Sequence, residues 1–246
     1  MIYIKSKKDI EAIRKACAIW KKVKAELTAQ TKAGITTIEL DKIAGREIIK
    51  HKSTPSFLNY NGFPANICIS VNEELIHGIP SNYKIKNGDM ITFDVGVTFE
   101  DHICDSAFTV IVGENEEAQK ISDATYKSLM ESINIIKPGV YTGDIGYKTE
   151  EIAKSSGYEV IKDFGGHGCG NKLHEDPSVL NYGNNGEGTK LKPGMTLCIE
   201  PMLMTGSDEY ITLDNKWTIV SKNNKLTCHW EHMVLVTENG FEILTI

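Results

Sequence analysis

The sequence predicts an α+β protein made of two related halves, and two observations lead to this prediction. Each half begins with amphipathic helical segments, which apolar, β-branched strands follow. In addition, three short stretches recur in the same order, namely residues 31–40 with 136–145, 77–80 with 174–177, and 86–94 with 192–200. Because three ordered matches rarely arise by chance, we expect one domain over residues 1–246, with halves of about 1–113 and 114–246 related by an approximate twofold axis.

Two helices are predicted at the start of the first half. Apolar side chains recur at helical spacing over residues 7–30, and Gly34 is expected to stop this helix. A second helix is expected to start from a cap at Thr36 or Thr37 and to bury one stripe of side chains, Leu40, Ile43, Ala44 and Ile48. A loop rich in proline and glycine then precedes the apolar strand predicted at residues 66–71.

A hairpin over residues 91–112 is the most informative part of the first half, because it carries Asp94 and Asp105 between β-branched residues. A turn at residues 100–101 would place both aspartates on one face as diagonal neighbours. Two carboxylates so close repel each other unless a proton or a cation lies between them. Either aspartate alone could simply cap or solvate a strand end, but a convergent pair favours a cation site.

The second half repeats this order and adds further polar residues to apolar segments. A helix is predicted over residues 118–136, and another from a cap at Thr142 or Asp144 to about Ser156. Three side chains then stand out in their surroundings: His167 within a glycine-rich run, Glu200 at the end of an apolar run, and Glu231 inside the predicted strand 226–236. The internal repeat makes Asp94 equivalent to Glu200 and His77 equivalent to His174.

Together these residues predict a metal site. Four carboxylates and one imidazole, from Asp94, Asp105, His167, Glu200 and Glu231, exceed the charge of one divalent ion and match two. Oxygen ligands with one imidazole suit Mn²⁺, Fe²⁺, Co²⁺ or Zn²⁺. Other catalytic motifs fail in detail, because the chain has no HExxH, no phosphate-binding loop and no GxSxG.

Composition and charge exclude several classes of protein. A formal net charge of −6 provides no basic field for nucleic acid or anionic membranes, and we expect no nucleic-acid substrate. No apolar run has the length of a membrane span or signal peptide, so we expect a cytoplasmic protein. The basic residues between Lys5 and Lys24 are expected to form a solvated helix face. The six cysteines contain no CxxC, and most of them are expected to be small buried hydrophobic residues.

The full set of motifs resembles the type I methionine aminopeptidases over essentially the whole chain. The resemblance lies in the order of the five acidic and imidazole residues and in the motifs His77-Gly-Ile-Pro, Gly-His-Gly-x-Gly, His174-Glu-x-Pro, Ile-Glu-Pro and Glu-His. It implies a pita-bread fold, in which a curved antiparallel sheet has helices outside it, with two metal ions. The implied activity is removal of the initiator methionine from nascent proteins whose second residue is small. The short stretch between His174 and Glu200, and an N-terminus without a zinc-binding extension, match the short bacterial form.

The resemblance also implies a role for each metal ligand. Asp94 would chelate one ion, Asp105 and Glu231 would bridge both ions, and His167 and Glu200 would complete the shell of the other. The metals would activate a bridging water, and Glu200 would accept its proton.

Two histidines and an apolar pocket are expected to bind the substrate. His174 would contact the scissile carbonyl and His77 the peptide nitrogen, although either ring could instead only hold a turn with the following proline. The methionine side chain would enter a pocket formed by Phe57, Tyr60, Phe63, Cys68, Leu173 and Trp217. Leu173, Phe57 and Met233 depart from the family pattern, in which an aromatic residue, a cysteine and a threonine are common at these positions.

Two alternative functions remain open from the sequence. One is an aminopeptidase P or prolidase that cleaves before proline, which is disfavoured because the chain begins directly with the catalytic repeat. The other is a binding protein of the same fold without catalysis, which is disfavoured because all five ligands are present. We further expect a monomer, and at most a weak, transient contact between the basic N-terminal helix and the ribosome.

Overall fold

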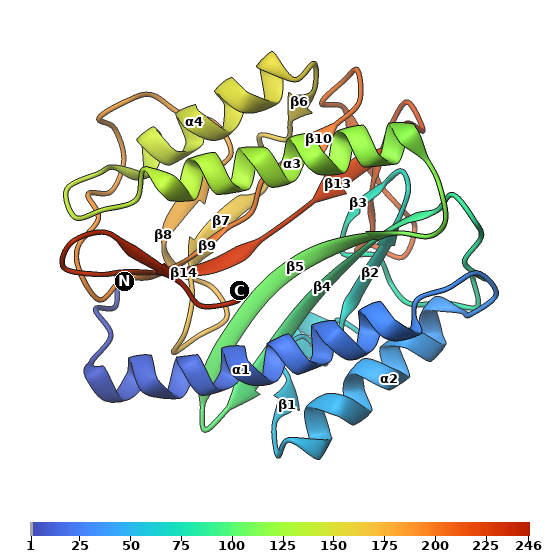
Figure 1. The fold of residues 1–246 in the computed structure, drawn as a ribbon, viewed down its shortest axis with the longest axis horizontal. Coiled ribbons are helices and arrows are strands. Elements are labelled where there is room, and N and C mark those ends of the chain that lie inside the picture. Colours follow the sequence, from blue (N-terminus) through green and yellow to red (C-terminus); the bar gives the residue numbers. More distant parts are fainter. Residues whose placement is uncertain (1) are drawn as a thin grey trace.

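The computed structural model describes residues 2–246 and shows two helical layers with β-strands between them (Figure 1). Helices α1 and α2 lie along one side of the molecule, and α3 and α4 lie along the opposite side. The elements of the first half are α1 (Lys7–Gln30), α2 (Thr37–Lys50), β1 (Thr54–Pro55), the 3₁₀ turn η1 (Tyr60–Gly62), β2 (Cys68–Val71), β3 (Glu74–Ile76), β4 (Met90–Phe99) and β5 (His102–Ile111).

The second half contains two more helices and ten strands among the described residues. They are α3 (Glu116–Asn134), α4 (Thr142–Ser155), β6 (Glu159–Val160), β7 (Gly165–Gly168), β8 (Glu175–Leu180), β9 (Thr196–Ile199), β10 (Met202–Met204), β11 (Tyr210–Thr212), β12 (Ile219–Ser221), β13 (Thr227–His229), β14 (His232–Val236) and β15 (Phe241–Ile243). The strands pair antiparallel, and the larger groups are β15-β14-β9-β7-β8 and the set around β4, which pairs with β5 on one edge and with β1 and β2 on the other.

The helix starts follow from local capping. Thr36 caps α2 as predicted, because its side chain accepts from the Glu39 amide while Glu39 accepts from the Thr36 amide. The predicted cap of α4 is wrong by one residue or more: Tyr141 is the cap, and its amide donates to Asp144 Oδ2 over 2.8 Å. The helix α1 ends at Gln30, and Gly34, with a φ of +96°, forms the turn that follows.

The aspartate hairpin has the predicted register. The turn consists of Glu100 and Asp101, with φ values of +47° and +60°, as a two-residue hairpin turn with the twist of its strands requires. The resulting pairs are Phe99 with His102, Gly96 with Asp105 and Asp94 with Ala107. Asp94 and Asp105 therefore lie on one face of the β4–β5 ribbon.

The internal repeat is visible in the backbone hydrogen bonds. In each half, the glycine amide in the turn before the second helix donates to a carbonyl just before a central strand, over 2.8 Å in the first half and 3.0 Å in the second. The equivalent contacts are Gly34 to Ile85 and Gly139 to Leu191, with isolated bridges between Thr36 and Lys84 and between Tyr141 and Lys190. The same local conformation thus ties the turn before each half's second helix to the segment that leads into its central strand.

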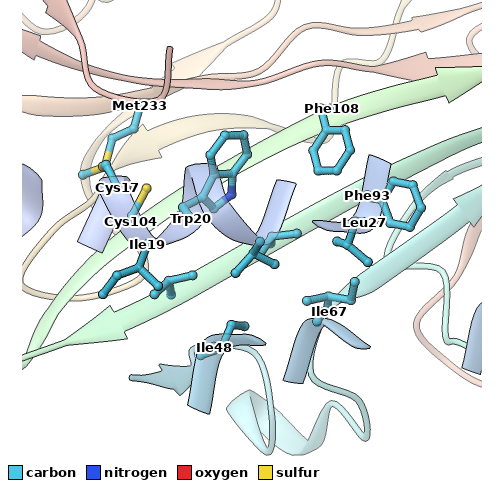
Figure 2. Packing of buried hydrophobic residues seen from close by; sticks show 14 of the residues in the cluster. Cys17, Ile19, Trp20, Leu27, Ile48, Ile67, Phe93, Cys104, Phe108 and Met233 are labelled. Atoms are coloured by element: carbon cyan, nitrogen blue, oxygen red, sulfur yellow. The ribbon is translucent and has the colours of Figure 1, made fainter. Parts of the chain in front are cut away.

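The largest core cluster lies between α1 and the β4–β5 ribbon (Figure 2). Trp20 meets the edge of Phe108 at 6.0 Å between ring centroids, and Phe93 stacks on Phe108 at 5.1 Å. Cys17 and Met233 bring their sulfur atoms to 3.8 Å in the same cluster. All six cysteines are buried and free, which confirms the prediction that they act as small hydrophobic residues.

The predicted single strand 226–236 is wrong, because it divides into two. Strand β13 pairs with β10, whereas β14 pairs with β9, so the chain crosses between sheets at Trp230 and Glu231. The Glu231 amide donates to the Ala107 carbonyl over 3.0 Å, which ties the crossing to the aspartate hairpin. Glu231 therefore occupies a bend between two sheets. Along residues 2–246, no helix is long and apolar enough to cross a bilayer.

The N-terminal basic residues do not all form a solvated face. Lys5 is 5 % exposed and its ammonium pairs with Glu175, whose other carboxylate oxygen accepts from the Asn171 and Lys172 amides over 2.7 and 2.8 Å. Lys24 is half-buried and its ammonium lies near three aromatic rings, those of Trp20, Phe108 and Trp230. The other lysines of α1, unlike Lys24, are exposed as predicted.

The Lys5–Glu175 pair predicts a measurable stability effect. Replacement Lys5→Met leaves a buried, unpaired carboxylate and is expected to reduce the free energy of unfolding by about 3–5 kcal/mol. The double replacement Lys5→Met with Glu175→Gln should recover much of this loss, because no buried charge then remains. Urea unfolding of the metal-free proteins measures both changes, and equal stability of the single and double variants would contradict the prediction.

Candidate metal centre

A cavity of about 740 Å³ lies where the two halves meet, and the residues expected to act in the site all line it. Its wall includes the expected metal ligands Asp94, Asp105, His167, Glu200 and Glu231, the histidines His77 and His174, and the pocket residues Phe57, Tyr60, Phe63, Cys68, Leu173 and Trp217. The five expected ligands come from β4, β5, β7 and the ends of β9 and β13, so both halves contribute to the site.

Three carboxylates converge inside this cavity. Oxygen atoms of Asp94, Asp105 and Glu231 lie within 4.8 Å of one another. One oxygen of each is buried and has no hydrogen-bond partner among the described residues. Buried carboxylate oxygens without donors are costly, and a cation between them would remove that cost. The donor set therefore fits divalent metal ions.

His167 has the tautomer and orientation of a ligand. Its Nδ1–H donates to the Gly168 carbonyl over 3.0 Å, which leaves the Nε2 lone pair free. Nε2 lies 3.5 Å from Glu200 Oε1 and 3.9 Å from Asp105 Oδ2. The imidazole thus points its acceptor nitrogen at two of the carboxylates.

Two glycines of β7 allow the backbone around His167 to lie close to the neighbouring strands. A Cβ on Gly166 would lie 2.1 Å from the Cys198 carbonyl oxygen, and one on Gly168 would lie 2.4 Å from the Asp176 carbonyl oxygen. No side chain fits at either position, so β7 can lie directly against β8 and β9 only with glycine there. The glycine-rich run seen in the sequence thus brings His167 next to Glu200.

The carboxyl groups have strongly raised pKa values in the metal-free protein. Burial raises the pKa of Asp94 to about 7. Burial, then the charges of Glu231 and Asp94, raises the pKa of Asp105 well above its ordinary value. Burial and neighbouring carboxylates likewise raise the pKa values of Glu200 and Glu231. Without bound cations, the site therefore favours the protonated forms of these groups, as expected for like charges in one low-dielectric site.

The pKa values of the imidazoles shift in the opposite direction, because burial disfavours their charged form. Burial, followed by the charge of His174, lowers the pKa of His167 to about 4, although the bond to Gly168 opposes this shift. The pKa of His77 is lowered to about 4 for the same two reasons. Both rings are therefore neutral at pH 7, which is the form that a metal ligand or a hydrogen-bond donor to a carbonyl requires.

His77 and His174 both line the cavity. His77 has a φ of +57°, a strained conformation that costs about 1–3 kcal/mol and that is concentrated at functional positions. Tyr60 Oη lies 2.9 Å from His174 Nδ1, and the rings of His174 and His167 meet edge to face at 4.4 Å. Tyr60 thereby orients His174 toward the carboxylate cluster.

Five of the six residues expected to form the methionine pocket belong to an apolar cluster, whereas Tyr60 is exposed and lies outside it. Its buried members are Phe57, Phe63, Ala65, Cys68 and Leu173, and Trp217 packs against them. The Phe63 and Trp217 rings meet edge to face at 5.2 Å. A Cβ on Gly96 would lie 2.6 Å from Phe57, so this glycine makes room for the larger ring. Met233 does not line the cavity, and its departure from the family pattern affects the core instead.

Two side chains in the site escaped the sequence reasoning. Cys198, Asp105 and His167 have potential ligand atoms within 4.8 Å of one another, although burial raises the pKa of the thiol well above its ordinary value. His229 is 2 % exposed, lines the cavity and places Nε2 3.6 Å from Glu200 Oε2. The signal for His229 was its position two residues before Glu231 in an apolar segment.

Comparison with known proteins agrees with this geometry. Residues 11–238 match the model of metallopeptidase family M24. The methionine aminopeptidase of Clostridium perfringens is 42% identical, over 100% of this chain and 99% of that protein. The crystal structure of methionine aminopeptidase from Rickettsia prowazekii superposes with a TM-score of 0.98 and 36% identity, with both chains covered completely. Prolidase from Pyrococcus horikoshii is more distant, with a TM-score of 0.78, 25% identity and coverage of 99% of this chain but 63% of its own.

These similarities confirm the expected α+β pita-bread fold. The acidic cluster, the oriented imidazole and the full-length match all agree, and the chain belongs to metallopeptidase family M24.

Proposed function

We propose that this chain is a single-domain, metal-dependent aminopeptidase that removes the initiator methionine from nascent polypeptides whose second residue is small. One observation carries the proposal, namely that a cluster of buried apolar residues and a cluster of carboxylates line the same cavity. The names of the relatives in Clostridium and Rickettsia support the same substrate.

Two divalent ions, of manganese, iron, cobalt or zinc, are the cofactors in this proposal. Asp94, Asp105, His167, Glu200 and Glu231 would hold these ions, because their potential ligand atoms converge in one cavity. The charge of the cluster supports two ions, because four carboxylates would keep an excess negative charge around one. When bound, such ions lower the pKa of a water molecule to near 7, so that hydroxide is available at neutral pH.

The protein side chains then position the substrate and move the protons. Glu200 is the base that accepts a proton from the attacking water and returns it to the leaving amine. With Tyr60 donating to its Nδ1, His174 presents Nε2–H to the carbonyl oxygen and stabilises the negative charge that develops there. His77, which also lines the cavity, contacts the nitrogen side of the peptide bond.

Specificity for methionine follows from the apolar pocket. An unbranched thioether side chain fits among Phe57, Phe63 and Leu173 and makes favourable contacts with aromatic rings. The polar groups at the pocket entrance then fix the peptide backbone. This separation of apolar and polar walls supports cleavage after a terminal methionine.

Peptide hydrolysis tests the proposal directly. The purified protein, reconstituted with each of the four metals, is assayed with Met-Gly-Met and with a peptide of the same length that begins X-Pro. Cleavage of Met-Gly-Met alone is the expected result. Cleavage of the X-Pro substrate alone would show a prolidase-like enzyme, and cleavage of neither by fully loaded protein would show a binding protein of the same fold.

We also propose a cytoplasmic monomer, and a weak, transient ribosome contact through the exposed part of α1. Lys21 and Lys22 are exposed, whereas Lys24 packs among aromatic rings and does not belong to that surface. Changing Lys21 and Lys22 to Glu is therefore the appropriate test. Unchanged co-sedimentation with ribosomes would remove the proposed contact.

A further inference from the structure

His229 is held rigidly beside the carboxylate cluster by its backbone. His229 is the last residue of β13 and pairs with Met202 of β10. Met202 follows Glu200 by two residues. Its carbonyl accepts a hydrogen bond from Thr109 Oγ1 over 2.9 Å. Because strand pairing fixes both backbones, the His229 ring must face the Glu200 side of the cavity.

The His229 ring is buried without a conventional partner. Neither ring nitrogen forms a hydrogen bond to another described residue, although the side chain is 2 % exposed. The nearest acidic atom is Glu200 Oε2, 3.6 Å from His229 Nε2. The other oxygen of the same carboxylate, Oε1, lies 3.5 Å from His167 Nε2. Glu200 therefore lies between two imidazoles.

The two imidazoles have different hydrogen-bonding states. His167 uses Nδ1–H on Gly168, so its Nε2 faces Glu200 and Asp105 as a lone pair. His229 has no such partner on Nδ1, and a neutral imidazole carries one N–H that must lie on one of its nitrogens. A proton on His229 Nε2 faces a carboxylate acceptor, whereas a proton on Nδ1 would face none. The Nε2–H tautomer is therefore favoured.

We propose that His229 is a positioning residue, which donates Nε2–H to Glu200 Oε2 and so fixes the carboxylate with Oε1 turned toward His167 and the metal that they share. The inference rests on the proposed function only in that Glu200 is a metal ligand. Carboxylate ligands usually accept a hydrogen bond from a neighbouring residue, and loss of such a partner typically reduces metal affinity or activity about 10–100-fold.

The proposal separates metal affinity from folding stability. In the metal-free protein, His229 is a buried polar ring with both nitrogens unpaired, so an apolar side chain of similar size should be tolerated or stabilising. In the metal-loaded protein, the same replacement removes the donor to Glu200. A residue that only fills space would show the opposite pattern, with lost stability and unchanged metal affinity.

The experiment compares His229→Leu, which removes the donor, with His229→Gln, which keeps an N–H of similar reach. Co²⁺ is titrated into metal-free protein by calorimetry and by its visible absorption. We expect His229→Leu to weaken one of two Co²⁺ equivalents about 10–100-fold, and His229→Gln to restore affinity to within about threefold. Metal-free His229→Leu should unfold in urea at the wild-type midpoint or above it. The control is His102→Leu, because His102 does not line the cavity.

Each other outcome overturns the proposal. Wild-type Co²⁺ affinity in His229→Leu would show that the contact does not position Glu200. Equal weakening in the Leu and Gln variants would show that ring shape, and not hydrogen-bond donation, matters. Lower metal-free stability of His229→Leu would show a structural role. Because Co²⁺ binding is read without a peptide, a wild-type protein that binds two ions but cleaves no Met-peptide overturns the proposed function alone.

Discussion

Replacing Asp105 by Asn is expected to reduce kcat/KM for Met-Gly-Met by about 10³-fold or more, which corresponds to about 4 kcal/mol of lost transition-state stabilisation. Asp105 lies at the centre of the site, with its oxygens near those of Asp94 and Glu231 and 3.9 Å from His167 Nε2. An amide has nearly the same shape but lacks the charge, so the replacement removes a negative charge from the proposed metal site without creating a cavity.

The same replacement should stabilise the metal-free protein, because it removes one member of a repelling, buried carboxylate cluster. Metal content, peptide turnover and urea unfolding in EDTA measure the three effects. Asp41→Asn is a matched control: Asp41 is also buried, but it accepts hydrogen bonds from Asn66 and Ile67 outside the cavity. The control should lose stability and keep metal and activity. Undiminished turnover by Asp105→Asn would remove the metal-centre proposal.

Metal removal is expected to make stability fall as pH rises from 7 to 8. In this range, carboxyl groups of the unfolded chain are ionised, since their ordinary pKa values are about 4. In the folded, metal-free protein, burial and neighbouring carboxylates raise the pKa values of Asp105, Glu200 and Glu231 well above the ordinary range, so these groups bind protons more tightly than in the unfolded chain. The folded state thus binds more protons than the unfolded state, and stability decreases by about 1.4 kcal/mol per pH unit for each retained proton.

The histidines act in the opposite direction but at lower pH. Their folded pKa values lie near 4 for His77 and His167, so their effect is confined to the range between about 4 and their unfolded value of about 6.5. Urea unfolding at pH 7, 7.5 and 8, in EDTA and in Mn²⁺, tests the prediction. The Mn²⁺ samples should lose the downward slope, because metal binding strengthens as its ligands lose protons. A metal-free protein with constant stability over this range would contradict it.

Local rules were sufficient for much of the fold. The two-residue turn at residues 100–101 and the alternation of side chains along a strand put Asp94 and Asp105 on one face. Capping chemistry limited the start of α2 to Thr36 or Thr37, of which Thr36 is the cap, and helical spacing gave the buried stripe of α1. These features depend on residues close together in the chain, so a single sequence carries the information for them.

The long-range contacts were not visible in that way. The segment 226–236 divides near Glu231 because its first part pairs with β10 and its second part pairs with β9. No local signal in the sequence indicates which strands it will pair with. Lys5 is buried because Glu175, far along the chain, provides its counter-charge. The chain's own residue pattern thus established the helices, the hairpin and the set of acids and histidines. Their assembly into one cavity, with His229 beside Glu200, depends on sheet packing, in which backbones distant in sequence determine what each buried polar group meets.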